Sequence, residues 1–172
     1  TPQLRREISK YVRRQVGVEY DAMTEVLVSV GVSEALDIAL RSVINPGDEV
    51  IYHQPCYVSY SPSIALAHGK AIAAPTHAEN GFALTGDDLA SVITPKSKVL
   101  LLNFPTNPTG ATLDANECDK IARLAVEHDL LVITDEIYSE LTYEGEHESI
   151  VTRPGMRERP VYLHGFSKAF AM

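Results

Sequence analysis

The sequence alternates short apolar runs with amphipathic segments, and three of the apolar runs end in chemically useful side chains. Residues 98–102 run into the Pro- and Gly-rich turn 103–110, residues 130–134 run into Asp135, and residues 161–166 run into Ser167 and Lys168. In open α/β sheets, ligands bind at the carboxyl ends of the strands. The pattern therefore predicts a rigid polar turn, a carboxylate and an amine at one edge of a sheet.

Residue spacing predicts a three-layer α/β/α fold with a mainly parallel sheet, because strand-like runs alternate with helix-like segments. At 172 residues the chain is long enough for one core and one domain. The polar stretch 143–160 is expected to be a solvated loop or short helix. Helices are expected over residues 2–15, 33–43, 57–67, 86–93 and 114–128, and strands over 25–30, 49–52, 70–74, 98–103, 130–134 and 161–165.

The composition excludes several classes of function. A net charge of -8 argues against a surface for nucleic acid or an anionic membrane, since both need basic patches. No apolar run approaches the length of a membrane span, so the expected compartment is the cytosol. Cys56 and Cys118 are far apart and are expected to be free buried thiols rather than a disulfide. No metal site is expected, because His147-Glu148 lacks the second histidine of a zinc helix.

Residues 31–35 join the end of a strand-like run to the start of a predicted helix. Backbone N–H groups and the helix dipole at such a place favour an anion such as phosphate. Gly31 permits a tight turn, and Ser33 either caps the helix or donates its hydroxyl to a phosphate oxygen. Neither the glycine fingerprint of a dinucleotide site nor a P-loop lysine is present, so a dinucleotide site is not expected.

Each of the other candidate residues also has a purely structural interpretation. Tyr57 either stacks on a planar ligand or is a core or rim tyrosine. Asn107 either presents its amide to a ligand or only completes a turn. Asp135 is either the partner of a cationic ligand atom, with Tyr138 reaching the same ligand, or a helix cap or structural hydrogen-bond acceptor.

Lys168 taken alone would be a surface lysine. After a strand, with an aspartate at the neighbouring strand end, it becomes a candidate amine nucleophile, and burial there would favour the neutral amine. Glu136 points away from Asp135 by alternation and is expected to be structural.

Five motifs together resemble the large-domain portion of class I/II aminotransferases, which are fold-type I enzymes dependent on pyridoxal 5′-phosphate (PLP). The likeness covers nearly the whole chain and is nearest to the aspartate-aminotransferase-like branch, including N-acetyl-diaminopimelate-type enzymes. The motifs are residues 30–36, 46–50, 103–110, 135–138 and 167–170.

The resemblance implies roles for four residues near the cofactor ring. Lys168 would form the Schiff base with PLP and shuttle the proton between the substrate carbon and the cofactor. Asp135 would pair with the pyridinium nitrogen, which keeps the ring an electron sink. Asn107 and Tyr138 would hydrogen-bond the 3-oxygen of the ring.

The resemblance also implies contacts with the ring face and the phosphate. Tyr57 would stack on the ring, while Val32 and Ser33 would supply backbone N–H groups and the Ser33 hydroxyl to the phosphate. The Asn107–Pro108 peptide is a candidate cis bond. Two departures from the family pattern stand out, because Gly165 replaces a phosphate-binding serine and Glu34 replaces the usual lysine or glutamine.

The resemblance further implies that residues 1–172 are a PLP-binding large-domain fragment, because the sequence begins without Met and stops four residues after Lys168. The N-terminal arm, the small C-terminal domain with the arginine for the substrate carboxylate, the phosphate-binding arginine and an antiparallel strand after the lysine would all lie outside it. The fragment alone is expected to be inactive, while the parent enzyme would be a cytoplasmic homodimer.

The expected activity is transfer of an amino group from an amino acid to a 2-oxo acid. The alternatives are a PLP-dependent carbon–sulfur lyase, since the cofactor performs the difficult step in both, and a non-catalytic PLP-binding regulatory domain. A third alternative is an α/β domain in which Lys168 is only structural.

Overall fold

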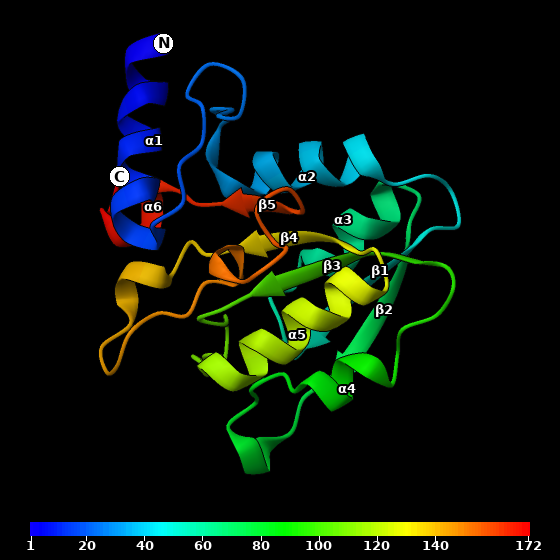
Figure 1. Cartoon of the computed structure of the whole chain (residues 1–172). Helices are drawn as coiled ribbons and strands as arrows, with labels where there is room; N and C mark the ends of the chain where they lie inside the picture. The colour runs from blue at the N-terminus through cyan, green and yellow to red at the C-terminus, as the bar shows by residue number, and fades with distance from the viewer.

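A single five-stranded parallel sheet forms the centre of the computed structural model, which describes all 172 residues (Figure 1). Its strand order is β2-β1-β3-β4-β5. The strands are β1 (Glu49–Gln54), β2 (Lys70–Pro75), β3 (Ser97–Asn103), β4 (Leu131–Asp135) and β5 (Pro160–Leu163). The helices are α1 (Pro2–Val16), α2 (Gly31–Val43), α3 (Tyr60–Leu66), α4 (Gly86–Ala90), α5 (Ala115–Glu127) and α6 (Phe166–Ala169), with 3₁₀ turns η1 (Ala78–Asn80), η2 (Ser139–Leu141) and η3 (Ile150–Thr152).

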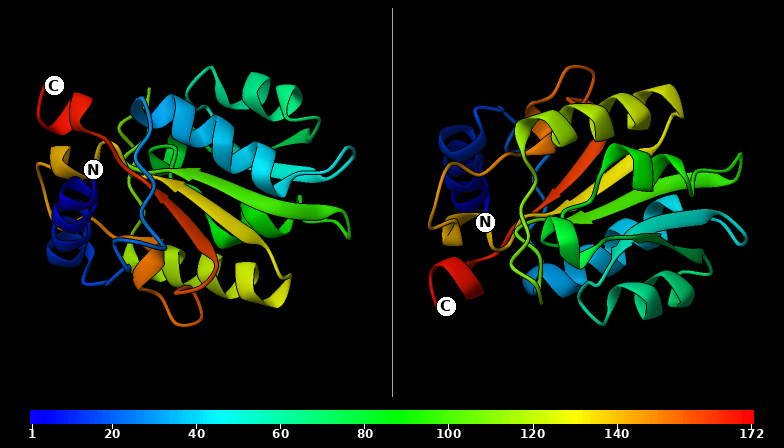
Figure 2. Two further views of the ribbon diagram at one scale, coloured as in Figure 1. Left: turned by 90° about the horizontal axis from the view of Figure 1, so that it is seen from above. Right: turned by 90° about the horizontal axis from the view of Figure 1, so that it is seen from below.

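Helices cover both faces of the sheet, which confirms the predicted three-layer α/β/α architecture. Helices α2 and α3 lie on one face, and α4 and α5 lie on the other (Figure 2). Alternate residues of one strand enter the two cores. Val50 and Tyr52 of β1 pack in the cluster under α2 and α3, whereas Ile51 packs in the cluster under α5.

Strand register brings the carboxyl ends of the central strands to one level. Asn103, the last residue of β3, pairs with Asp135, the last residue of β4, and Asp135 pairs with Leu163, the last residue of β5. The turn 103–110, Asp135 and the segment that carries Lys168 therefore all leave the same edge of the sheet. This convergence confirms the arrangement predicted from the strand ends.

Helix α1 stands beyond this carboxyl edge, beside α6 (Figures 1 and 2). Its first turn begins with Pro2 as expected, and the Oγ1 of Thr1 caps it by accepting the N–H of Leu4 at 3.3 Å. The rings of Tyr11 and Phe170 meet with centroids 5.9 Å apart, which joins the first helix to the last.

Residues 25–30 form no strand, so that expectation is wrong. The segment has no neighbouring strand to complete its backbone hydrogen bonds, and Leu27 and Val30 are 71% and 87% exposed. Residues 25–29 and β5, the edge strand, both line a mainly apolar cavity of about 610 Å³. Helix α2 begins at Gly31, two residues earlier than expected, and α3 begins at Tyr60, three residues later.

The polar stretch 143–160 agrees only in part with the expectation of a solvated loop or short helix. It forms loops around the short turn η3, but Ser149, Ile150, Val151 and Met156 are buried. Both cysteines are free, with Cys118 buried and Cys56 half-buried. None of the helices combines the length and the apolar character that crossing a membrane requires.

Candidate active site

Asp135 is a buried carboxylate at the carboxyl edge of the sheet, with neutral partners only. Its residue is 5% exposed. Its Oδ2 accepts the Tyr60 hydroxyl at 2.8 Å, and its Oδ1 accepts the backbone N–H of Ile137 at 3.2 Å. Burial raises the pKa of Asp135 from 3.8 to about 6, although both hydrogen bonds act to lower it. A buried carboxylate without a cationic partner is suited to a cationic N–H donor.

Tyr60 was not predicted from the sequence as a site residue. It lies in the first turn of α3, is 2% exposed, and its pKa is raised by burial and by the adjacent Asp135 carboxylate. Tyr57 lies three residues earlier and meets the Tyr60 ring edge to face, with centroids 5.6 Å apart. Tyr57 itself is 37% exposed and its hydroxyl forms no hydrogen bond with the protein, so one side of its ring can accept a ligand. Helical spacing from Tyr57 was the one signal that could have indicated Tyr60.

Asn107 and Tyr138 meet beside Asp135. The Nδ2 of Asn107 donates to the Tyr138 hydroxyl at 3.4 Å, and both side chains are half-buried. The Asn107–Pro108 peptide is cis, as the resemblance implied. An amide and a phenol thus converge from two different strand ends, and together they can bind one oxygen atom of a ligand.

The first turn of α2 lies at the same edge. Gly31 has φ +76°, the left-handed conformation that favours glycine. Ser33 is exposed and does not cap the helix, because the helix begins at Gly31 with Val30 as N-cap. The capping alternative for Ser33 is therefore wrong. The Glu34 carboxylate instead accepts the backbone N–H of Val30, which leaves the next N–H groups free for an anion.

Gly165 lies between β5 and α6 in the chain and packs against the first turn of α2. A Cβ at Gly165 would lie 2.8 Å from Cγ2 of Val32 and 3.6 Å from Cδ1 of Ile137. The buried Val32 side chain therefore occupies the space that a serine would need here. The glycine at this position, where the family has a serine, therefore agrees with the packing of Val32 around it.

Lys168 is exposed, so the burial that would favour its neutral amine is not found here. It lies on α6, a single helical turn that follows β5, and its amine forms no hydrogen bond or ion pair with another side chain. Phe166 and Phe170 of this turn pack against each other, with ring centroids 6.0 Å apart, but both are exposed. The exposure follows from the shortness of the turn, which has no residue buried in the core. The structure therefore brings Asp135, Asn107 and Tyr138 together but records no contact between Lys168 and Asp135.

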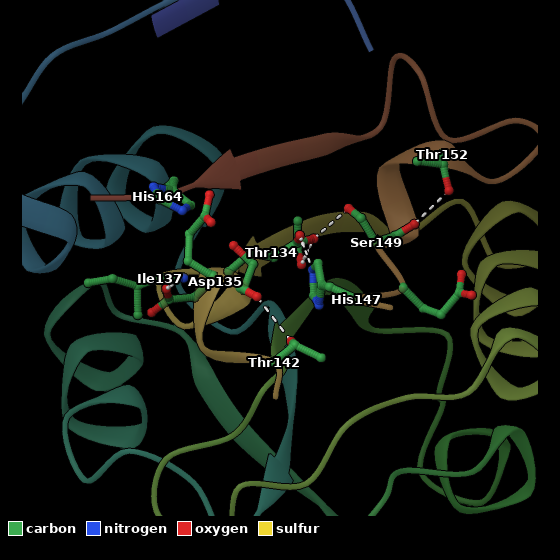
Figure 3. A network of polar contacts seen from close by, with 12 residues as sticks. Thr134, Asp135, Ile137, Thr142, His147, Ser149, Thr152 and His164 are labelled. Carbon is green, nitrogen blue, oxygen red and sulfur yellow. Dashed lines mark hydrogen bonds and ion pairs between the residues drawn. The ribbon is translucent and has the colours of Figure 1, made fainter. Parts of the chain in front are cut away.

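Glu136 belongs to a separate buried cluster, in agreement with its expected structural role. Its carboxylate accepts the hydroxyls of Ser149 at 2.7 Å and Thr134 at 3.0 Å, and it lies 2.5 Å from Nε2 of His147. Figure 3 shows Asp135 and His147 on either side of the end of β4. The cluster attaches the segment after η2 to the sheet.

The whole chain matches a known protein family. The model of aminotransferase class I and II matches residues 1–172. A putative aminotransferase of Bacillus subtilis is 46% identical over 169 residues, covering 98% of this chain and 44% of that protein. An aspartate aminotransferase of Pyrococcus abyssi is 42% identical over 172 residues, covering 99% of this chain and 44% of that protein.

Solved structures agree with the sequence relatives. The aromatic aminotransferase from Pyrococcus horikoshii matches with a TM-score of 0.97 and 41% identity, covering 99% of this chain and 46% of that one. The chain thus spans a little under half the length of the relatives it matches. With the family model matching from end to end and relatives above 40% identity, the chain belongs to the aminotransferase class I and II family.

Proposed function

We propose that residues 1–172 form the cofactor-binding large domain of a PLP-dependent aminotransferase, which moves an amino group from an amino acid to a 2-oxo acid. The observation that carries the proposal is Asp135, a buried carboxylate at a strand end with no cationic partner of its own. Membership of the aminotransferase family supports the reaction class. The proposed extent agrees with a chain that matches 44% of the length of its relatives.

The residues present fit PLP, which has three polar groups that need partners in a binding site: the ring nitrogen, the phenolic oxygen and the phosphate. A pyridine nitrogen that carries a proton suits the buried Asp135 carboxylate. A phenolic oxygen suits the Asn107 amide and the Tyr138 hydroxyl, which already meet at 3.4 Å. A phosphate suits the free N–H groups of Val32 and Ser33 in the first turn of α2. When bound, PLP supplies an aldehyde and an electron sink.

The chain's own residues would then bind, orient and move a proton. Asp135 would hold the ring nitrogen protonated, and its site would keep water away because the residue is buried. Tyr57 would cover one face of the ring. Lys168 would supply the amine that binds the aldehyde and would carry the proton removed from the substrate carbon. Because Lys168 is exposed, its amine is accessible to an aldehyde.

The substrates, partner and compartment belong to the proposal as well. Relatives are named for aspartate, aromatic amino acids and N-succinyldiaminopimelate, so an amino acid and a 2-oxo acid are the proposed substrate classes and the donor is left open. We further propose a cytoplasmic homodimer, on the strength of the family resemblance alone. We also propose that it binds neither nucleic acid nor membrane, which the net charge of -8 supports.

Product analysis tests the proposed reaction. The polypeptide encoded by the whole gene is incubated with PLP, 2-oxoglutarate and a panel of amino acids. The proposal predicts formation of glutamate that depends on the donor. Release of ammonia and pyruvate from cysteine or cystathionine, without glutamate, would favour the carbon–sulfur lyase. PLP binding without turnover would favour the regulatory domain. The named relatives are aminotransferases, which gives neither alternative support. Residues 1–172 alone should be inactive in the same assay.

A further inference from the structure

Asn103 lies behind the candidate site and bonds to two of its members at once. Its Nδ2 donates to the backbone oxygen of Asp135 at 2.8 Å, and its Oδ1 accepts the backbone N–H of Asn107 at 3.2 Å. The residue is 1% exposed. Because one partner is an acceptor and the other a donor, the orientation of the amide is fixed by its neighbours.

The backbone N–H and the backbone carbonyl of Asn103 are both hydrogen-bonded to side chains. Its N–H donates to Nε2 of His53 at 3.2 Å, and its carbonyl accepts the Thr106 hydroxyl at 2.7 Å. His53 is 1% exposed and its ring stacks on Phe104, with centroids 4.6 Å apart. Burial lowers the pKa of His53 to about 4, so the imidazole stays neutral and its Nε2 remains an acceptor at physiological pH.

We propose that Asn103 is the positioning residue that sets the separation between the Asp135 and Asn107 contacts of the cofactor ring. The inference rests on the proposed function. Under that function Asp135 serves the ring nitrogen and Asn107 serves the 3-oxygen, which are different edges of one rigid ring. Asn103 is the side chain that bonds to the main chain of both, and β3–β4 register holds it opposite Asp135. Asn103 does not itself touch the ligand.

The preference for a ring that carries the 3-oxygen tests this role. Two probes suffice, namely pyridoxine 5′-phosphate and its 3-deoxy analogue. Neither has an aldehyde, so Lys168 forms no bond with them and only ring and phosphate contacts are measured. Isothermal titration calorimetry on the whole protein gives the ratio of the two dissociation constants. A general loss of stability weakens both probes alike, whereas a displaced Asn107 reduces the ratio.

Asn103→Ala should reduce the preference for the 3-hydroxyl probe roughly five- to tenfold, the equivalent of one hydrogen bond. Asn80→Ala is the matched control. The Nδ2 of Asn80 also donates to a main-chain carbonyl, that of Ala83 at 3.2 Å, but Asn80 belongs to η1 and bonds to no residue of the candidate site. The control should keep the wild-type ratio. If Asn103→Ala does not fold, Asn103→Ser replaces it, since a serine hydroxyl is too short to bond to both partners.

The outcomes separate this inference from the proposed function. A wild-type protein that prefers the 3-hydroxyl probe, together with a reduced ratio in the Asn103 variant, supports both. An unchanged ratio in a folded Asn103 variant overturns the positioning role and leaves the proposed function standing. A wild-type protein that binds neither probe overturns the proposed function, and the inference with it.

Discussion

Replacing Tyr60 with phenylalanine removes the one side-chain hydrogen bond that reaches the Asp135 carboxylate. The Tyr60 hydroxyl donates to Oδ2 at 2.8 Å, and both residues are buried. With Asp135 ionised, the variant loses a hydrogen bond to a charge, which costs about 1.5–3 kcal/mol. With Asp135 protonated, the lost bond joins neutral groups and costs about 1 kcal/mol. The difference should raise the pKa of Asp135 further above 6, by roughly one unit.

The pH dependence follows from the direction of this shift. Burial in the folded protein raises the pKa of Asp135 from its ordinary value of 3.8 to about 6. The folded state therefore binds more protons than the unfolded state between these values, and the free energy of unfolding falls as the pH rises through them. In Tyr60→Phe the fall should continue to roughly pH 7, so the stability difference between variant and wild type should widen between pH 4 and pH 8.

Urea denaturation of the cofactor-free protein at a series of pH values measures this difference. Tyr57→Phe is the control, because the Tyr57 hydroxyl has no hydrogen bond in the protein and its residue is 37% exposed. The control should follow the wild-type curve. A stability difference for Tyr60→Phe that stays constant from pH 4 to pH 8 would refute the coupling between Tyr60 and the Asp135 charge.

Two further substitutions test other contacts. Gly165→Ser should destabilise the protein by about 1–3 kcal/mol in urea denaturation, because a Cβ there would lie 2.8 Å from the stiff Val32 side chain. Adding Val32→Ala should recover much of the lost stability. A Gly165→Ser variant as stable as the wild type would contradict the packing argument. Glu136→Gln should speed amide hydrogen exchange in residues 147–152, because it weakens the bonds to His147 and Ser149 that fix this segment. Exchange as slow as in the wild type would contradict that, and Glu144→Gln is the exposed control.

The architecture could be predicted because its signals are local. Apolar runs of strand length, separated by helical periodicity, predict a parallel sheet, and the strand ends then place Asp135 and the turn 103–110 at one edge. The same reasoning wrongly predicted a strand over residues 25–30. A β-branched run becomes a strand only when a neighbour completes its hydrogen bonds, and no neighbour is encoded within the run itself.

The inner part of the site could not be predicted because it depends on tertiary contacts. Tyr60 and Asp135 are 75 residues apart in the sequence, and Asn103 and Asp135 are 32 apart. No spacing in the sequence indicates these contacts. Strand order brings Asn103 beside Asp135, and the packing of α3 brings Tyr60 to the same carboxylate. The exposure of Lys168 has the same origin, because a lysine after a strand is buried only if other elements cover the turn that carries it.

Reduction with borohydride in the presence of PLP, followed by peptide mass mapping, tests the central claim most directly. The account predicts that a pyridoxyl group is found mainly on Lys168, and that Lys168→Arg abolishes the modification without unfolding the protein. Label spread over the exposed lysines Lys10, Lys96 and Lys120, or no label in the polypeptide encoded by the whole gene, would contradict it.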